Sequence, residues 1–312
     1  MALYTKPYLS LLDQLALIKS RGLKVADASD ALECLHRNGY YRLSAYWFPF
    51  REIVAGKRTD AFLSGSRFED AVALYQFDKK FKLVLLDAIE RVEIAVRVEI
   101  ARVLGQRDPF AHTNASLFRP NFSSNGSHNN EYLKWIAKFN NLCDQSSAEF
   151  IVHHKQQYGP YSPLPIWIAI ELWDFGMLSY AFSGMQYRDQ VAVATRFNLL
   201  DWRLMASWLQ RLNYVRNVIA HHGRLWNLNL SAPRLPALGT IQDLDSLLAL
   251  PNAHTRIYSI CCILCFLSRI INPKSVWIDE MKTFVAAFPV MPHASIQAMG
   301  FPAHWRSDSV WR

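Results

Sequence analysis

The residues best suited to chemistry lie together in the stretch YVRNVIAHHGRLWN, at positions 214–227. Arg216, Asn217, His221 and His222 interrupt an otherwise apolar and aromatic helical pattern within seven residues. On a helix that advances about 100° per residue, Arg216 and His221 lie about 140° apart, whereas Asn217 and His221 lie one above the other. The stretch therefore places an arginine, an amide and two imidazoles near one end of a helix.

These residue types are suited to phosphate chemistry. A guanidinium presents a fork of donors that fits a phosphate, and an imidazole can move protons near neutral pH. Together they suffice for RNA cleavage without a metal, in which an acid or base serves the 2′-hydroxyl and the leaving oxygen and a cation stabilises the pentavalent phosphorane. A second interpretation fits equally well: His221 and His222 cap the C-terminus of the helix, with Gly223 as its C′ residue.

The helix that carries these residues is expected to span about 201–222. Its buried stripe is predicted at Leu212, Val215 and Ile219, and His222 continues the same three-to-four spacing. The other polar residues of the stretch then lie around the rim of that stripe.

Helical periodicity dominates the whole chain, and strand-like alternation is nearly absent, which predicts an all-α fold. Ser10 with Asp13 three residues later indicates a helix start. The aromatic stretch YYRLSAYWFPF, residues 40–50, has strand-like or short helical character. A long surface loop is predicted over residues 107–130, and an irregular tail is predicted from residue 288 onward. Helices are expected at about 10–21, 27–37, 67–104, 131–144, 149–157, 165–182, 187–197, 201–222, 241–249, 253–271 and 273–287.

Composition narrows the class of protein. The chain has 312 residues, of which 51% are hydrophobic and 19% charged, so it folds around a large core. Its formal net charge of +8 favours a polyanionic partner such as nucleic acid. The longest apolar run, near 257–271, is too short to cross a bilayer, which predicts a soluble protein without a membrane role. The cysteines of the CCILC stretch, residues 261–265, read as buried thiols of a reduced, cytoplasmic protein.

Several longer motifs resemble those of a known family. KPYLSLLDQLALIKSRGL, NGYYRLSAYWFPF, LYQFDKKFKLVLLDAIERVEIAVR, LPIWIAIELWDFGMLSYAF and RNVIAHHGRLWN occur in this order along the chain. Their order and spacing resemble the Abi family of abortive-infection proteins, of the AbiD and AbiF type. The Arg-Asn-x-x-x-His arrangement of Arg216 to His221 also resembles the motif of HEPN-superfamily ribonucleases. The resemblance covers roughly residues 6–227 and is less distinct in the C-terminal third.

The resemblance implies an all-α, HEPN-like helical bundle with an antiphage role. It implies an N-terminal region over 1–65, a core over 66–230 and a C-terminal extension over 231–312, within one compact unit. It further implies an endoribonuclease that needs no cofactor and no metal, with RNA as its partner, either as substrate or as a regulatory noncoding RNA. A non-catalytic RNA-binding or protein-binding module in a toxin–antitoxin-like system is the alternative.

The resemblance also assigns roles to the polar residues. Arg216 would bind the scissile phosphate, His221 would be the general acid or base, and Asn217 would orient the imidazole or the phosphate. His222 lies at a spacing that also fits the motif. In such proteins two Arg-His motifs meet at one site, and this chain carries one, so a composite site requires a homodimer.

Three further residues are candidates for supporting the site. Glu171 lies in a strongly apolar predicted helix, where a carboxylate needs a partner. If Glu171 lines the site, that partner is Arg216 or a histidine; if its role is structural, the partner is another arginine. Arg42 and Tyr41, in the aromatic stretch, would contact phosphates and stack on unpaired bases, unless that stretch forms core. Glu93 and Arg97, at i and i+4, are spaced for an ion pair within one helix, with a catalytic role as the alternative.

Overall fold

The computed structural model describes residues 3, 5, 7–123, 131–250 and 253–312, and it is predominantly helical, as the sequence predicts. The α-helices are α1 (Leu11–Ser20), α2 (Ala28–Asn38), α3 (Tyr40–Trp47), α4 (Phe68–Gly105), α5 (Pro120–Ser123), α6 (Glu131–Gln145), α7 (Glu149–Tyr158), α8 (Ile166–Ala169), α9 (Phe175–Gly184), α10 (Tyr187–Arg196), α11 (Trp202–Ala220), α12 (Asp245–Leu248), α13 (Ile257–Ile271) and α14 (Trp277–Ala286). The strands are β1 (Arg51–Val54) and β2 (Lys57–Phe62).

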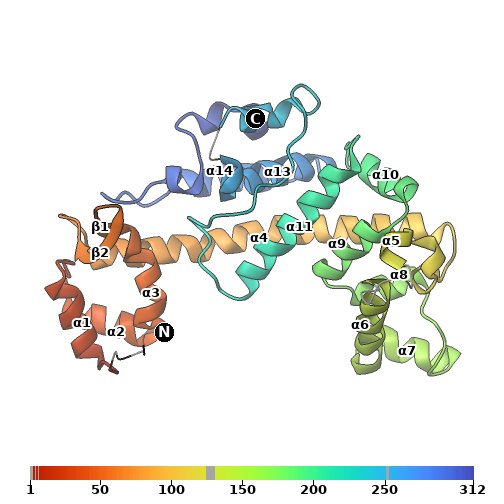
Figure 1. Cartoon of the computed structure of the whole chain (residues 1–312), viewed down its shortest axis with the longest axis horizontal. Helices are drawn as coiled ribbons and strands as arrows, with labels where there is room; N and C mark the ends of the chain where they lie inside the picture. The colour runs from red at the N-terminus through yellow and green to blue at the C-terminus, as the bar shows by residue number, and fades with distance from the viewer. Residues whose placement is uncertain (1–2, 4, 6, 124–130, 251–252) are drawn as a thin grey trace.

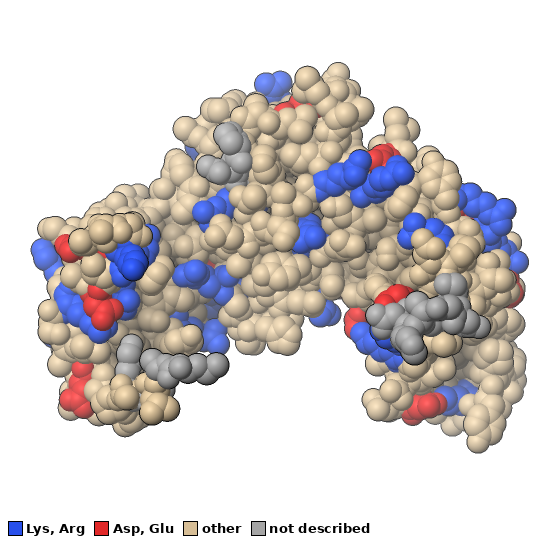
Figure 2. Space-filling view, viewed as in Figure 1, with Lys and Arg blue, Asp and Glu red and all other residues tan. Residues whose placement is uncertain are grey.

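Helix α4 organises the molecule. Its 38 residues span about 57 Å at 1.5 Å per residue, and they cross the whole width of the protein in Figure 1. Helices α1 to α3 and the hairpin form an N-terminal lobe at one end of α4, while α5 to α9 form a distal lobe toward the other. Helices α13 and α14 lie along α4 on the side away from these two lobes. The two lobes project to the same side, so the molecule is an arch with a concave face (Figures 1 and 2).

The first helix starts as the sequence predicts. The Ser10 hydroxyl accepts a hydrogen bond from the Asp13 backbone N–H, and the Asp13 carboxylate accepts one from the Ser10 N–H, which completes a capping box. The aromatic stretch after α2 forms α3 and a short 3-10 helix, η1 (Phe48–Phe50), and it buries Tyr46 and Trp47 against α4. Of the two interpretations of this stretch, the helical one is correct.

The antiparallel hairpin of β1 and β2 was not predicted from the sequence. Ala55 and Gly56 both have positive φ, 50° and 76°, which matches the twist that a two-residue hairpin turn requires. The strands are short and mostly exposed, so their sequence shows little of the alternation that reveals a half-buried strand.

Two other predictions need correction. The expected loop at 107–130 instead contains the 3-10 helices η2 (Ala111–Thr113) and η3 (Ala115–Leu117) and then α5, with Phe118 and Phe122 buried; residues 124–130 lie outside the described residues. The single helix expected over 165–182 is broken into α8, η4 (Ile170–Leu172) and α9. The break occurs because the Asp174 carboxylate accepts the Met177 N–H at 2.7 Å and starts a new helix.

The C-terminal part departs from expectation in smaller ways. The 3-10 helices η5 (Gln242–Leu244) and η6 (Ala253–Thr255) replace the starts of two predicted helices. The tail contains η7 (Ile296–Met299), η8 (Trp305–Ser307) and η9 (Ser309–Trp311), and it packs Trp305 and Trp311 into the core. Helix α13 buries Cys261, Cys262 and Cys265, as predicted for thiols in an apolar helix.

Candidate active site at the end of helix α11

Helix α11 positions the polar residues of the 214–227 stretch. Asp201 caps its start by accepting the Arg203 N–H, and Leu212, Val215 and Ile219 are buried as predicted. The helix ends at Ala220, two residues before the expected end, so both histidines lie beyond its last helical residue.

The chain leaves α11 through a Schellman motif. His221 is the C-cap residue, the His222 N–H donates to the Ile219 carbonyl at 3.0 Å, and the Gly223 N–H donates to the Val218 carbonyl at 2.8 Å. His222, at φ 56°, therefore holds the left-handed C′ position that the sequence assigned to Gly223. Gly223 is needed for space: a Cβ there would lie 2.9 Å from Val218 Cγ1.

The exit turn exposes the two imidazoles. His221, His222 and Asn217 are exposed, so the continuation of the buried stripe to His222 is wrong. Arg216 is half-buried, and its Nη1 lies 3.5 Å from the Asn217 Oδ1. Among the residues that the structure describes, neither imidazole has a hydrogen-bond partner. The side chains that could move protons are thus open to solvent at the end of a fixed helix.

A buried carboxylate on α4 fixes the segment that follows the histidines. Asp78 is fully buried, and its carboxylate accepts hydrogen bonds from the Tyr46 hydroxyl at 2.7 Å and from the N–H groups of Leu225 and Trp226 at 3.2 and 2.7 Å. Lys82 Nζ lies 3.4 Å from the same carboxylate. Burial raises the pKa of the Asp78 carboxyl, although the charge of Lys82 and these hydrogen bonds favour the ionised form.

Three cations bind backbone carbonyls around this segment. Lys82 Nζ donates to the Gly223 carbonyl at 3.0 Å, and Arg42 Nη1 on α3 donates to the His222 carbonyl at 2.9 Å. Arg224 donates to the Ala45 carbonyl. The structure thus brings Arg42 to the histidines, whereas Tyr41 is 91% exposed on α3 and lies outside the core. We call the group Asp78, Lys82, Arg42 and Arg224 the α11 clamp.

The other side of the site is acidic. The charge of Arg216 acts on the carboxyl groups of Glu93 and Asp174. Burial raises the pKa of Glu93 against the charges of Arg97 and Arg216. Burial would also raise the pKa of Asp174, but the hydrogen bonds from Lys138 and the Met177 N–H and the charges of Lys138 and Arg216 lower it below its usual value. Arg216 therefore lies within electrostatic range of two carboxylates.

Glu171 has a structural partner. Its carboxylate lies 3.2 Å from Arg97 Nη1, and Arg97 also pairs with Glu93 at 3.1 Å and donates to the Trp173 carbonyl at 3.0 Å. Of the two alternatives for Glu171, the pair with another arginine is the one found. The Glu171 side chain is 48% exposed in η4, so its expected position on a long apolar helix is wrong. The predicted ion pair of Glu93 and Arg97 is confirmed.

A family model described as "Abi-like protein" matches residues 33–227, more than half of the chain. The chain belongs to the Abi-like protein family. Membership suggests a role in abortive infection, a form of phage defence. Comparison with curated proteins and with solved structures gave no significant match.

The matched region of this Abi-like protein contains both α11 and the α11 clamp. Sequence reasoning missed Asp78 and Lys82, although a signal was present: both interrupt the apolar stripe of α4 between Leu74 and Leu85. A carboxylate and an amine at i and i+4 on a buried face need partners from elsewhere in the chain. Asp174 and Lys138, which pair at 2.6 Å, were also missed, because they meet only when α6 packs against the start of α9.

The described part of this Abi-like protein contains neither a cluster of metal-ligand side chains nor a helix that could span a membrane. Its histidine, cysteine, aspartate and glutamate side chains form no group of three or more that could hold a metal ion. None of its helices combines the length and the apolar character that a bilayer span requires.

Proposed function

We propose that this Abi-like protein is a metal-independent endoribonuclease that acts in phage defence. The observation that supports it best is the exposure of the His221 and His222 imidazoles at the end of the helix that carries Arg216, where the buried Asp78 carboxylate holds the segment that follows. A group that transfers protons must be free of competing partners, and among the described residues these imidazoles are free, on a backbone segment that hydrogen bonds to Asp78, Lys82 and Arg42 hold in place.

The reaction would proceed by attack of the RNA's own 2′-hydroxyl. His221 takes the 2′-hydroxyl proton, the 2′-oxygen bonds to phosphorus, and the bond to the 5′-oxygen breaks as that oxygen receives a proton from an acid. Arg216 stabilises the charge of the phosphorane, and Asn217, which lies within 3.5 Å of the guanidinium, orients it. The products are a 2′,3′-cyclic phosphate and a 5′-hydroxyl. His222 takes the place of His221 in the alternative assignment.

A second copy of the chain would complete the site. Arg216 lies within α11 and His221 at its C-cap, no hydrogen bond joins these two described side chains, and the charge of Arg216 acts on the carboxylates of Glu93 and Asp174. One copy would supply the base and the other the acid, so the proposal includes a homodimer with two such motifs face to face.

The proposal is tested by cleavage of labelled RNA in EDTA. Wild type is compared with Arg216→Ala and His221→Ala, and with the matched controls Arg188→Ala and His153→Ala, which remove exposed side chains of the same kinds elsewhere. Cleavage is expected to be lost in the first pair and kept in the controls. Persistence in both site variants would remove the assignment of the site.

A non-catalytic RNA-binding module is the second candidate. The acidic neighbours of Arg216 count against a catalytic role for its guanidinium, because their charge weakens its attraction for the scissile phosphate, while the net charge of +8 still favours RNA binding by other cations of the chain. Retention of RNA in a mobility-shift assay, with no cleavage by wild type, would establish this candidate instead.

A further inference from the structure

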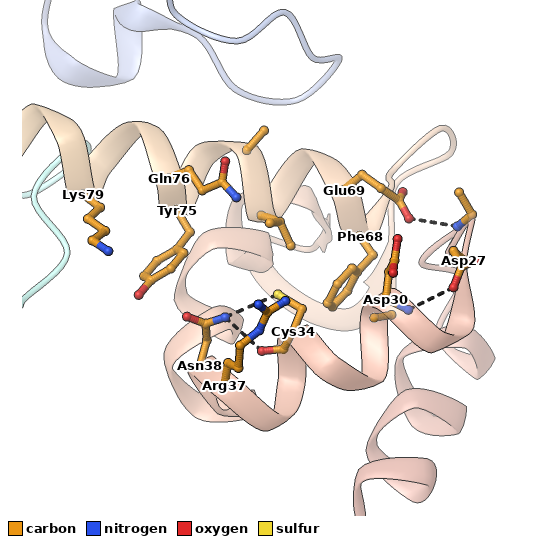
Figure 3. Close-up of a pocket in the computed structure, with 14 residues that line it drawn as sticks. Asp27, Asp30, Cys34, Arg37, Asn38, Phe68, Glu69, Tyr75, Gln76 and Lys79 are labelled. Atoms are coloured by element: carbon orange, nitrogen blue, oxygen red, sulfur yellow. Dashed lines mark hydrogen bonds between the residues drawn. The ribbon is translucent and has the colours of Figure 1, made fainter.

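A cavity of about 690 Å³ opens between α2 and α4 in the N-terminal lobe, and neither the catalytic residues nor the α11 clamp line it (Figure 3). Its middle is apolar, with Ala31, Val72, Ala73 and the ring of Phe68. Its volume is within the range of small-ligand sites in proteins.

The two ends of the cavity carry opposite charge. Asp27, Asp30 and Glu69 lie at one end, and Arg37 and Lys79 lie toward the other (Figure 3). This separation suits a ligand with hydrogen-bond donors at one end and negative charge at the other.

Among the described residues, two of these five charged groups are free to bind a ligand, and a third, Arg37, is in an exposed ion pair with Glu33 at 3.6 Å. Asp27 is occupied, since its carboxylate caps α2 by accepting the Asp30 N–H at 2.9 Å, and Glu69 Oε1 accepts the Ala26 N–H at 2.9 Å. The Asp30 carboxylate and the Lys79 ammonium, in contrast, engage no partner in the part of the chain that the structure describes. Both side chains line the cavity and are exposed.

The cationic end adjoins the proposed active site. Lys79 lies about one helical turn before Lys82, whose Nζ donates to the Gly223 carbonyl. Asn38, which also lines the cavity, lies four residues before Arg42, which donates to the His222 carbonyl. Lys79 and Asn38 thus lie three and four residues before two residues that hold the exit of α11, so a phosphate at Lys79 and the histidines are within the reach of one RNA strand.

We propose that this cavity binds one nucleotide of the RNA substrate, with its phosphate at Lys79 and Arg37 and a guanine base directed to Asp30. The proposal rests on the proposed ribonuclease function and adds base preference to it. Guanine presents a ring N–H and an amino group side by side, which together suit the two oxygens of one carboxylate. Uracil presents one N–H between two carbonyl oxygens, which the Asp30 carboxylate repels. The ring of Phe68, which lies beside Asp30 in Figure 3, supplies apolar contact for the base.

The first experiment measures binding of GMP and UMP by calorimetry to the full chain carrying His221→Ala. GMP is expected to bind at least about tenfold more tightly than UMP. Asp30→Asn should remove that preference, and Lys79→Gln should weaken both nucleotides by about tenfold, while Lys80→Gln, an equal change of charge one residue away, leaves both unchanged. Equal affinity for GMP and UMP, or a preference that survives Asp30→Asn, would overturn the assignment of guanine.

A second variant tests the cavity itself. Ala73→Phe places a ring in the middle of the cavity without removing a polar group, and it should abolish binding of both nucleotides. Glu280→Gln, on the exposed face of α14, is the control for the change of charge in Asp30→Asn. Circular dichroism checks that each variant is folded. Nucleotide binding that survives in folded Ala73→Phe protein would show that the cavity is not the site.

Cleavage assays separate this proposal from the proposed function. If wild type binds GMP in the cavity but cleaves no RNA, the ribonuclease function fails and the nucleotide site stands. If wild type cleaves RNA, and Asp30→Asn and Ala73→Phe cleave the same RNA at the same positions and rate, the nucleotide site is wrong and the ribonuclease stands.

Discussion

The Asp78 carboxylate on α4 accepts the backbone N–H of Trp226 at 2.7 Å, across 148 positions of sequence. This bond joins the longest helix to the segment that follows the histidines. Because the carboxylate is fully buried and also accepts bonds from Tyr46 and Leu225, the direction in which the chain leaves α11 is set by the core.

Replacement of this carboxylate should destabilise the protein strongly. Asp78→Asn keeps the size of the side chain but puts an amide NH₂ where N–H and O–H donors converge, and it leaves Lys82 without its counter-charge. The free energy of unfolding in urea should fall by about 2–4 kcal/mol. Asp87→Asn, in an exposed i, i+4 pair with Arg91, is the matched control and should change it by less than about 1 kcal/mol. Equal effects of the two substitutions would contradict the role of Asp78.

Substitution of His222 by glycine distinguishes the two histidines. His222 has φ 56°, a conformation that glycine adopts without strain, so His222→Gly should leave stability unchanged or raise it by up to about 1 kcal/mol. RNA cleavage should persist if His221 is the acid or base. Loss of cleavage with unchanged stability would transfer that role to His222. Thermal unfolding and the cleavage assay measure the two effects on the same sample.

Arg42 should matter for the site more than for the fold. Its guanidinium holds the His222 carbonyl from an exposed position, so Arg42→Ala should lower the cleavage rate about tenfold and the unfolding free energy by less than about 1 kcal/mol. Arg58→Ala is the control, because Arg58 also donates to backbone carbonyls, those of Pro49 and Arg51 in the N-terminal lobe. A similar loss of cleavage in both variants would mean that Arg42 has no special relation to the site.

Burial of His112 predicts a dependence of stability on pH. Its side chain is fully buried against Phe139 and Trp173, neither ring nitrogen has a hydrogen-bond partner among the described residues, and burial lowers its pKa from 6.5 to about 4. Between these values the unfolded chain binds a proton that the folded chain does not. Stability is therefore full above pH 6.5 and falls by up to about 3 kcal/mol as the pH drops to 4.

His112→Phe should remove this part of the pH dependence, because phenylalanine does not titrate and fits an aromatic cluster. Urea midpoints of wild type and variant, measured at pH 7 and pH 4.5, provide the check. His153→Phe, at an exposed position of α7, is the control and should keep the pH dependence of wild type. An identical pH dependence in wild type and His112→Phe would rule out His112 as its source.

Much of the fold could be predicted from the sequence because its local signals agree with its packing. The stripe of α11, the capping box of α1 and the length of α4 all depend on residues within a few turns of one another. The hairpin and the helix break at Asp174 were missed because their local signals are weak. Short exposed strands show little alternation of apolar and polar residues. An aspartate within an apolar run can be recognised as a helix N-cap only when the fold shows that one helix ends and another begins there.

The sequence by itself determined that α11 exists, which face of it is buried, and which polar residues lie at its end. The tertiary structure decided where those residues point and what surrounds them. The i, i+4 pairing of Glu93 with Arg97 is local, so spacing predicted it, whereas Glu171 reaches Arg97 from 74 residues away. The clamp of Asp78, Lys82 and Arg42 on the exit of α11 likewise depends on chain segments more than 140 residues apart, and no pattern along the sequence records their contact.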